Sequence, residues 1–298
     1  MGVKQHNLIV IAGPTAVGKT SFAIELAAIL KTEIISADSR QFYKEISIGT
    51  AKPSPEELAL IPHHFINNLS ISDYYNVSKF ENEVLDLLNK LFLQHKNVVM
   101  VGGSGLYIDA VCKGIDDLPD ADESLRKELK LQFKNNGLDD LLKELERLDL
   151  DYYNEIDKSN PNRVLRALEV IKSTGLKFSD LRKKSVKERP FNIHKFCLNR
   201  ERDELFERIS VRVDQMIEEG LVNEAKKQWS NRNHNALNTV GYKEIFRYLD
   251  GDIDLEQAII DLKTNTRRYA KRQLTWFKRD DSYLWIHPNQ MDQVLKSI

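Results

Sequence analysis

Residues 13–20 read GPTAVGKT and match G-x-x-x-x-G-K-[ST], the pattern of a phosphate-binding loop, or P-loop. Gly13 and Gly18 permit a tight turn whose backbone N–H groups point inward at phosphate oxygens. Lys19 brings a positive charge to the outer phosphate, and the Thr20 hydroxyl can ligate Mg²⁺. The motif predicts a phosphate site with a divalent cation, but it identifies neither the phosphate compound nor the reaction.

Asp38 follows Glu33–Ala37, a short apolar stretch that is typical of a buried strand. Ligands of open α/β sheets bind at the carboxyl ends of the strands. A carboxylate at such a position can accept a proton from a nucleophile or hold a metal ion through water. Asp is also common in turns that close a strand, so position alone leaves both interpretations open.

A glycine-rich turn, GGSG at 102–105, follows a third apolar stretch, Asn97–Val101. ATPases and GTPases usually carry a metal-holding Asp at the end of one such strand, and this stretch ends in glycine. Glycines allow the close approach of a ligand, although they also serve packing alone. Ser104 adds a hydroxyl. The pattern argues against a motor or switch ATPase.

Basic residues cluster near the C-terminus, although the chain has a formal net charge of −1. Arg268, Lys271 and Arg272 are spaced i, i+3 and i+4, so they share one face of a predicted helix. Trp276 and Phe277 lie close by, and a basic face with aromatic side chains suits a phosphate backbone or an unpaired base. A solvated helix face is the alternative interpretation. Shorter basic pairs occur at Arg163 with Arg166 and at Arg208 with Arg212.

Alternating strands and helices must position these residues. Four stretches are typical of strands: Leu8–Ala12, Glu33–Ala37, Asn97–Val101 and Phe191–Leu198. Helices are expected after the P-loop through Leu30 and from an S-x-x-E capping box at Ser78–Glu81. This order predicts an α/β fold with a P-loop NTPase-like parallel sheet flanked by helices. The P-loop, Asp38 and the turn at 102–105 should converge on one crevice.

A helical insertion is expected to interrupt this core. From about Asp116 the chain becomes helical in period and dense in charge. The predicted catalytic core therefore comprises residues 1–115 and 191–298, and residues 116–190 form an inserted helical domain.

Local signals mark several helix ends and one basic segment. Asn160 is expected to be an N-cap with Pro161 in the first turn of its helix. Two long helices should follow the insertion, one ending at Gly220 and the other capped by Asp254. The basic stretch 181–189, LRKKSVKER, is expected to be mobile.

The composition predicts a cytoplasmic protein. The chain has 298 residues, 41% hydrophobic and 30% charged, and these proportions are ordinary for a globular protein. The apolar run near the N-terminus leads directly into the P-loop, which favours a core strand over a signal peptide. Cys112 and Cys197 match no metal-ligand spacing and are expected to be reduced. His63 and His64 have no acidic partner close in sequence, so a structural role is expected for them. Nothing demands more than a monomer.

Eight segments resemble, in order, the motifs of the tRNA dimethylallyltransferase family, also called the tRNA isopentenyltransferases. They are GPTAVGKT (13–20), SADSRQFY (36–43), GTAKP (49–53), HHF (63–65), GGSGLY (102–107), NPNRVLRALE (160–169), TVGYKE (239–244) and RYAKRQLTWFKR (268–279). GGSGLY departs from the more usual GGTGLY but keeps the hydroxyl. The resemblance spans nearly the whole chain and is far more specific than a P-loop alone.

The resemblance implies that dimethylallyl diphosphate, not ATP, occupies the P-loop. The five-carbon group would move to the exocyclic amine of the adenosine at tRNA position 37, just 3′ of the anticodon. Asp38 would be the general base, and Ser104 would lie near the transferred base. Lys19 and Arg212 would contact the leaving diphosphate with Mg²⁺, which Thr20 ligates. The implied diphosphate-binding residues are Gly13, Pro14, Thr15, Ala16, Val17, Gly18, Lys19 and Thr20.

The resemblance also implies an RNA-binding surface, with the insertion holding the anticodon stem. The implied tRNA-binding residues are Asp38, Ser39, Arg40, Gln41, Ser104, Arg126, Asn162, Arg163, Val164, Leu165, Arg166, Asn238, Thr239, Val240, Gly241, Tyr242, Lys243, Lys271, Arg272, Gln273, Trp276 and Lys278.

Other classes of protein remain as alternatives. A nucleoside or nucleotide kinase would need an arginine-rich lid, and the sequence has no clear one. A non-catalytic P-loop protein that binds RNA would not need Asp38. The adenylate isopentenyltransferases, which modify free nucleotides, are the nearest alternative, but the long insertion and the basic C-terminal helix favour tRNA.

Overall fold

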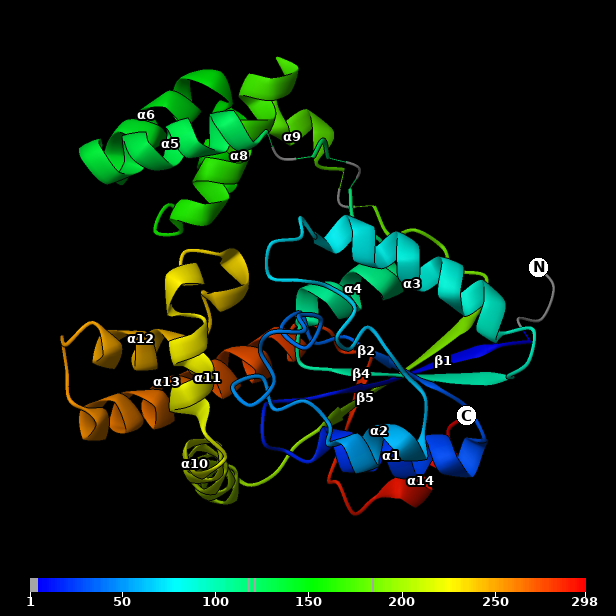
Figure 1. Cartoon of the computed structure of the whole chain (residues 1–298). Helices are drawn as coiled ribbons and strands as arrows, with labels where there is room; N and C mark the ends of the chain where they lie inside the picture. Colours follow the sequence, from blue (N-terminus) through cyan, green and yellow to red (C-terminus); the bar gives the residue numbers. More distant parts are fainter. Residues whose placement is uncertain (1–4, 117, 121, 184) are drawn as a thin grey trace. The chain divides into compact units, whose positions relative to one another are not determined.

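The computed structural model describes residues 5–116, 118–120, 122–183 and 185–298. These residues form two compact units (Figure 1). Unit 1 consists of Met1–Cys112 together with Glu188–Ile298, and unit 2 is Lys113–Lys187. Among the described helices, none has both the length and the apolar composition that crossing a bilayer requires.

Unit 1 is built on a six-stranded sheet in the order β3-β2-β4-β1-β5-β6, in which all paired strands are parallel. The strands are β1 (Asn7–Ala12), β2 (Ile34–Ser36), β3 (His63–His64), β4 (Asn97–Gly102), β5 (Asn192–Leu198) and β6 (Tyr283–Ile286). In the centre, Ala12 of β1 lies opposite Gly102 of β4 and Cys197 of β5. The carboxyl ends of the three central strands are therefore level. The predicted α/β class with a parallel sheet is confirmed.

Helices cover both faces of this sheet, with α3 and α4 on one face and α1 and α14 on the other (Figure 1). The helices of unit 1 are α1 (Lys19–Leu30), α2 (Pro55–Leu60), α3 (Val77–Leu91), α4 (Gly105–Lys113), α10 (Arg202–Glu218), α11 (Leu221–Lys227), α12 (Tyr242–Leu249), α13 (Leu255–Phe277) and α14 (Met291–Leu295). All six residues of β1 are buried, which explains why NLIVIA is almost wholly apolar rather than alternating.

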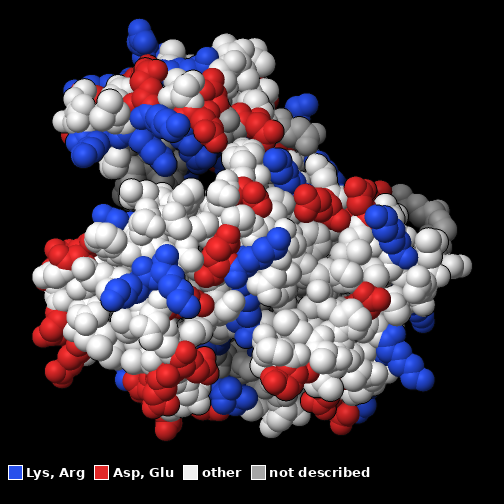
Figure 2. Space-filling model, viewed as in Figure 1, with Lys and Arg blue, Asp and Glu red and all other residues white. Residues whose placement is uncertain are grey.

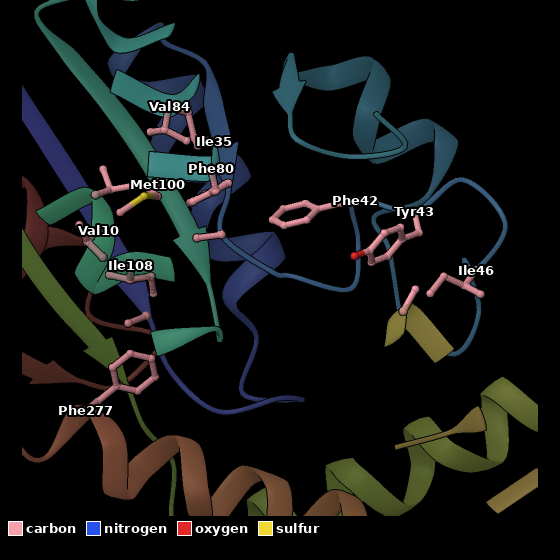
Figure 3. Close-up of a cluster of buried hydrophobic side chains, with 14 of the residues drawn as sticks. Val10, Ile35, Phe42, Tyr43, Ile46, Phe80, Val84, Met100, Ile108 and Phe277 are labelled. Atoms are coloured by element: carbon pink, nitrogen blue, oxygen red, sulfur yellow. The ribbon is translucent and has the colours of Figure 1, made fainter. Parts of the chain in front are cut away.

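Side chains that alternate along β1 enter two separate cores. Val10 packs in the cluster that contains Phe80 of α3 and Ile108 of α4 (Figure 3). Ile9 and Ile11 enter the cluster on the opposite face. Each fully buried side chain of this size contributes about 1.5–3 kcal/mol to the stability of the fold. The alternation therefore determines which side chains of β1 face each of the two cores.

Unit 2 is a helical bundle composed of α5 (Glu123–Asn136), α6 (Leu138–Leu148), α7 (Leu150–Glu155), α8 (Pro161–Thr174) and α9 (Phe178–Leu181). Its core includes Leu141 and Leu145 of α6, both fully buried. The predicted cap of α8 is confirmed, because the Asn160 side chain accepts a hydrogen bond from the Arg163 N–H and Pro161 opens the helix.

The capping box predicted at Ser78–Glu81 is wrong, and one residue of the stretch expected to be mobile, Arg189, is buried; the same ion pair explains both. The capping box expected at Ser78–Glu81 does not begin α3, since Asn76 is the N-cap and accepts from Lys79 N at 2.9 Å. Glu81 is instead buried and pairs with Arg189 at 2.6 Å. Arg189 belongs to the stretch expected to be mobile, yet it is buried and also donates to the Val111 and Ala110 carbonyls. Lys184 of that stretch lies outside the described residues.

Candidate active site

The P-loop lies between β1 and α1, where its glycines are required by the backbone. Gly13 has φ 146°, and a Cβ there would lie 2.7 Å from the Leu198 carbonyl oxygen of β5. Gly18 has φ 106° and is the N-cap of α1. The Lys19 amine folds back over the loop and donates to the Pro14 carbonyl at 2.7 Å. The loop therefore has the closed form that a phosphate cradle needs.

A cavity of about 620 Å³ opens over the P-loop. The P-loop, the ends of β2 and β4, α10 and α13 contribute to its lining, which includes Thr15, Lys19, Thr20, Asp38, Gly102, Arg208, Arg212, Tyr269 and Gln273. The predicted convergence of the strand ends is thus confirmed for the P-loop, Asp38 and Gly102. Six of the lining residues, among them Asp38 and Arg212, also line a smaller adjoining pocket of about 80 Å³ that reaches Thr239–Gly241.

Asp38 lies close to the basic groups of the cavity and affects how they titrate. Burial lowers the pKa of Lys19 to about 8, and the nearby Asp38 carboxylate partly opposes this shift. Burial also lowers the pKa of Arg212, and Asp38 again acts in the opposite direction. Burial raises the pKa of Tyr269, and the charge of Asp38 adds to that shift. One carboxylate therefore faces two cations and a phenol that stays protonated.

Asp38 both closes a turn and lines the cavity. Its Oδ1 accepts from Arg40 N at 3.0 Å, which closes the turn after β2. The same side chain lines the cavity. Ser104 does not line the cavity; its hydroxyl accepts from Ser39 N at 3.0 Å and so fixes the residue next to Asp38. The turn thus holds the carboxylate in place at the edge of the cavity.

The glycines at the end of β4 and in the turn after it allow other protein atoms to approach closely, and Gly102 also lines the cavity. A Cβ on Gly102 would lie 2.2 Å from the Ala37 oxygen, and one on Gly103 would lie 2.2 Å from Gln273 Nε2. A Cβ on Gly105 would lie 2.2 Å from Trp276 Cδ1. The packing interpretation of this turn is therefore the one that the structure supports.

Helix α13 presents different residues to the P-loop and to solvent. Gln273 is buried, with Oε1 accepting from Thr15 N at 2.9 Å and Nε2 donating to Gly103 O at 3.0 Å. Trp276 Nε1 donates to Asp109 at 2.9 Å. Lys271 and Arg272, in contrast, are exposed.

The implied tRNA-binding residues fall into two groups. Exposed side chains belong to Arg126, Asn162, Arg163, Asn238, Lys243, Lys271, Arg272 and Lys278. Val164 and Tyr242 are fully buried, so their side chains cannot contact RNA in this conformation. Arg166 is half-buried and pairs with Glu169 at 3.2 Å. The remaining residues of the set, Asp38, Ser39, Arg40, Gln41, Ser104, Leu165, Thr239, Val240, Gly241, Gln273 and Trp276, are half-buried or buried.

Charge on the visible surface is mixed. In Figure 2 the basic and acidic side chains are interspersed over the face shown, in agreement with a formal net charge of −1. Any attraction of a polyanion must therefore come from local groups such as the exposed basic face of α13.

Two arginines support the P-loop from outside, and their contacts were not predicted from the sequence. Arg200 Nε donates to the Val17 carbonyl at 2.9 Å, and Arg208 Nε donates to the Ala16 carbonyl at 2.8 Å. Arg208 also lines the cavity. The i, i+4 spacing of Arg208 and Arg212 was a usable signal, but nothing local marks Arg200. His64 has an acidic partner after all, since its Nε2 lies 2.6 Å from Glu33 Oε2.

Comparison with known proteins identifies the family of the chain. The family model for IPP transferase matches residues 41–280. The chain is 50% identical to tRNA dimethylallyltransferase 1 of Bacteroides fragilis, over 97% of this chain and 96% of that protein. Its structure resembles the tRNA isopentenylpyrophosphate transferase of Bacillus halodurans, with a TM-score of 0.72 and 39% identity over 98% of this chain and 95% of that one.

A eukaryotic dimethylallyltransferase acting on tRNA is also similar. The TM-score is 0.77 at 29% identity, over 97% of this chain and 75% of that one. Both the sequence and the fold therefore match the same group of enzymes over nearly the full chain. The chain belongs to the IPP transferase family, the family of the tRNA dimethylallyltransferases.

Proposed function

We propose that the chain transfers a dimethylallyl group from dimethylallyl diphosphate to the exocyclic amine of adenosine 37 in tRNA and releases diphosphate. The observation that carries this proposal is the P-loop cavity in which Lys19, Arg212 and Asp38 meet. A phosphate cradle with a carboxylate beside it provides for both the leaving group and the proton. We place this activity in the cytoplasm and expect the enzyme to act as a monomer.

The cationic groups act on the leaving diphosphate. As the allylic C–O bond breaks, its electron pair departs with the diphosphate and positive charge develops on carbon. P-loop N–H groups, Lys19, Arg208 and Arg212 would hold the diphosphate oxygens and stabilise their added charge. Because the cavity is preformed around the cradle, this stabilisation needs little reorganisation.

Mg²⁺ fits the donor set around the P-loop. Thr20 offers a hydroxyl and Asp38 a carboxylate at the cavity, and both are hard oxygen donors. Among the described residues no group of three or more His, Cys, Asp or Glu could hold a metal ion. Mg²⁺ commonly binds through one or two protein oxygens, substrate phosphates and water. When bound, it would neutralise charge on the leaving diphosphate.

Asp38 would act on the nucleophile. The lone pair of an adenine amine is delocalised, so the amine attacks well only if it can lose a proton as the new N–C bond forms. Asp38 would accept that proton, and Ser104 would keep the Asp38 turn in place through Ser39.

Binding of RNA would use both α13 and unit 2. The exposed face of α13 suits a phosphate backbone. Unit 2 carries exposed Arg126, Asn162 and Arg163, and we propose that it holds the anticodon stem. The adenine must leave the base stack to reach a buried diphosphate, as in other enzymes that modify bases.

A transfer assay tests this function against its alternatives. Labelled dimethylallyl diphosphate is offered with tRNA, an anticodon stem-loop, AMP or ATP in single-turnover reactions. We expect label in tRNA and the stem-loop, located at adenosine 37. Transfer to AMP but not to tRNA would assign the chain to the nucleotide-modifying enzymes, and phosphoryl transfer from ATP would assign it to the kinases.

A further inference from the structure

Two motifs, GTAKP (49–53) and TVGYKE (239–244), have no role in the chemistry described so far. In the structure they meet at Glu224 of α11, which lines none of the cavities around the P-loop. The Glu224 carboxylate receives four hydrogen bonds. Ser47 N and Ile48 N donate to Oε2 at 2.8 and 3.0 Å, and Gly49 N donates to Oε1 at 3.0 Å. The fourth donor is the Tyr242 hydroxyl, 2.5 Å from Oε1.

This arrangement saturates the carboxylate. An ionised carboxylate has about four lone-pair sites, and all four donors are on two segments far apart in the chain. Three consecutive backbone N–H groups pointing at one anion form a nest. Here the anion is a protein side chain, so the nest ties the segment 47–49 to α11.

Tyr242 completes the contact by packing. Its side chain is fully buried, and a Cβ on Gly49 would lie 2.6 Å from its ring. Glycine at position 49 is therefore needed for the ring to reach Glu224. Burial raises the pKa of the Tyr242 phenol, and the Glu224 charge adds to the shift, so the hydroxyl stays a donor at any ordinary pH.

The next residues along the chain form a wall of the active site. Thr50 and Ala51 line both the large cavity and the small pocket that share Asp38. Ala51 has φ 47°, a left-handed conformation that its surroundings must enforce. Gln41 Nε2 donates to the Ala51 carbonyl at 3.1 Å, and the Lys52 amine donates to Tyr43 O at 2.5 Å and to Asn67 Oδ1 at 2.6 Å.

The wall is thus held from both ends. Gln41 and Lys52 fix its far side, while Phe42, Tyr43 and Ile46, on the segment that leads into it, are anchored in the core (Figure 3). Glu224 and Tyr242 fix its near side. Without Glu224, the N–H groups of residues 47–49 would lose the three hydrogen bonds that tie this segment to α11.

We propose that Glu224 and Tyr242 are positioning residues for the transfer reaction: from outside the cavity, they set the wall at Thr50–Ala51 where the diphosphate site and the Asp38 pocket meet. The proposal rests on the proposed function only in naming the reaction. The geometry that it describes concerns the diphosphate site itself.

Glu224→Gln is the main test. Glutamine has nearly the same shape as glutamate, but its NH₂ group cannot accept hydrogen bonds and would face groups that donate them. Kinetics are measured at a temperature where the variant is fully folded by circular dichroism. We expect KM for dimethylallyl diphosphate to rise about tenfold while KM for tRNA stays within about twofold. Tyr242→Phe removes one of the four hydrogen bonds and should raise the same KM by a smaller factor, about twofold to fourfold.

Glu45→Gln is the matched control. Glu45 also holds a loop, accepting from Ser70 Oγ at 2.5 Å and from Ile71 N at 3.1 Å, but it lines no part of the cavity. It should lower thermal stability without changing either KM. A merely structural role for Glu224 would make its Gln variant behave in the same way, and that result would overturn the proposal.

Binding of inorganic pyrophosphate with Mg²⁺, measured by calorimetry, separates this proposal from the function. If the unmodified chain fails to prenylate tRNA, the proposed function is wrong. Weaker pyrophosphate binding by Glu224→Gln would still support the positioning role, and unchanged binding would refute it. Should Glu224→Gln fail to fold, Tyr242→Phe decides by the same two measurements.

Discussion

The side-chain amide of Gln273 bridges the P-loop and the turn after β4, because its Oε1 accepts from Thr15 N at 2.9 Å while its Nε2 donates to Gly103 O at 3.0 Å. The helix that bears it, α13, also carries the exposed Lys271 and Arg272. One helix therefore contacts the P-loop through Gln273 and exposes basic side chains to solvent.

Gln273→Met should weaken donor binding while the fold stays intact. Both hydrogen bonds would be lost, and the Thr15 N–H and Gly103 carbonyl would be left without their partner. At about 1–3 kcal/mol for such a loss, KM for dimethylallyl diphosphate should rise about tenfold or more. Gln257→Met, on the exposed face of the same helix, is the control and should leave KM unchanged. Equal KM values for the two variants would show that the bridge does not contribute to donor binding.

Asp38→Asn should abolish most of the transfer rate without disturbing tRNA binding. An amide cannot take the proton, and general-base contributions are typically about 10²–10⁴-fold. Single-turnover transfer measures the rate, and filter binding should give a tRNA dissociation constant within severalfold of the unmodified chain. Asp73→Asn changes an exposed acid outside the cavity and should retain full activity. Undiminished turnover in Asp38→Asn would contradict the base role.

The pH dependence of donor capture should follow Lys19. Burial lowers its pKa to about 8, so the amine is charged below that pH and neutral above it. Since it is the charged form that would bind diphosphate, kcat/KM for the donor should be flat with respect to Lys19 below about pH 8 and fall above it. Lys52 has a pKa lowered by burial to a similar value, about 8, so it must be distinguished. Lys19→Arg should remove the decline at alkaline pH, whereas Lys52→Arg should keep it.

Neutralising the basic face of α13 should weaken the binding of RNA and leave the binding of the donor unchanged. Lys271→Gln with Arg272→Gln should weaken tRNA binding and reduce the slope of log K against log salt by about 1 for each phosphate that the protein no longer neutralises. Donor KM should not change. Lys90→Gln, an exposed lysine at the end of α3, tests whether any loss of charge has the same effect. If the slope of log K against log salt were unchanged in the double variant, the RNA would not contact this face of α13.

The Arg189–Glu81 pair should dominate local stability. Arg189→Met leaves a buried carboxylate without its arginine, which should lower the free energy of unfolding by about 3–5 kcal/mol. Adding Glu81→Leu should recover most of this loss, as urea denaturation would measure. Lys127→Met breaks an exposed pair with Glu123 and should cost less than about 1 kcal/mol. Failure of the double variant to recover would show that Arg189 acts mainly through the Val111 and Ala110 carbonyls.

Local signals predicted the elements that place the chemistry. The apolar run of β1, the glycines of the P-loop and the acid after β2 are each marked by their own neighbours in the sequence, so the P-loop and the position of Asp38 after a strand could be predicted. Asn160 as the cap of α8 is a similar case, because capping depends on neighbours only three residues away.

Contacts between distant segments could not be predicted. Gln273 and Thr15 are separated by 258 positions, and Arg189 and Glu81 by 108. No periodicity or spacing links such residues, since only the fold brings them together. β3 and β6 were missed because strands of two and four residues are too short to show alternation. Glu224 has no local mark at all, since its backbone donors lie about 175 positions away.

The carboxyl ends of β1, β4 and β5 lie side by side, and this alignment restricts insertions and deletions in the chain. Ala12 of β1 lies abreast of Gly102 and Cys197, and the P-loop begins at the very next residue. Deleting one residue within β1 would shift the P-loop by about 3.3 Å relative to Asp38. The same deletion would turn the β1 side chains on one side of the deleted position to the opposite core. We therefore expect β1 to tolerate substitutions that keep the side-chain volume, but not insertions or deletions. The length of β1 should accordingly vary less than the identity of its residues.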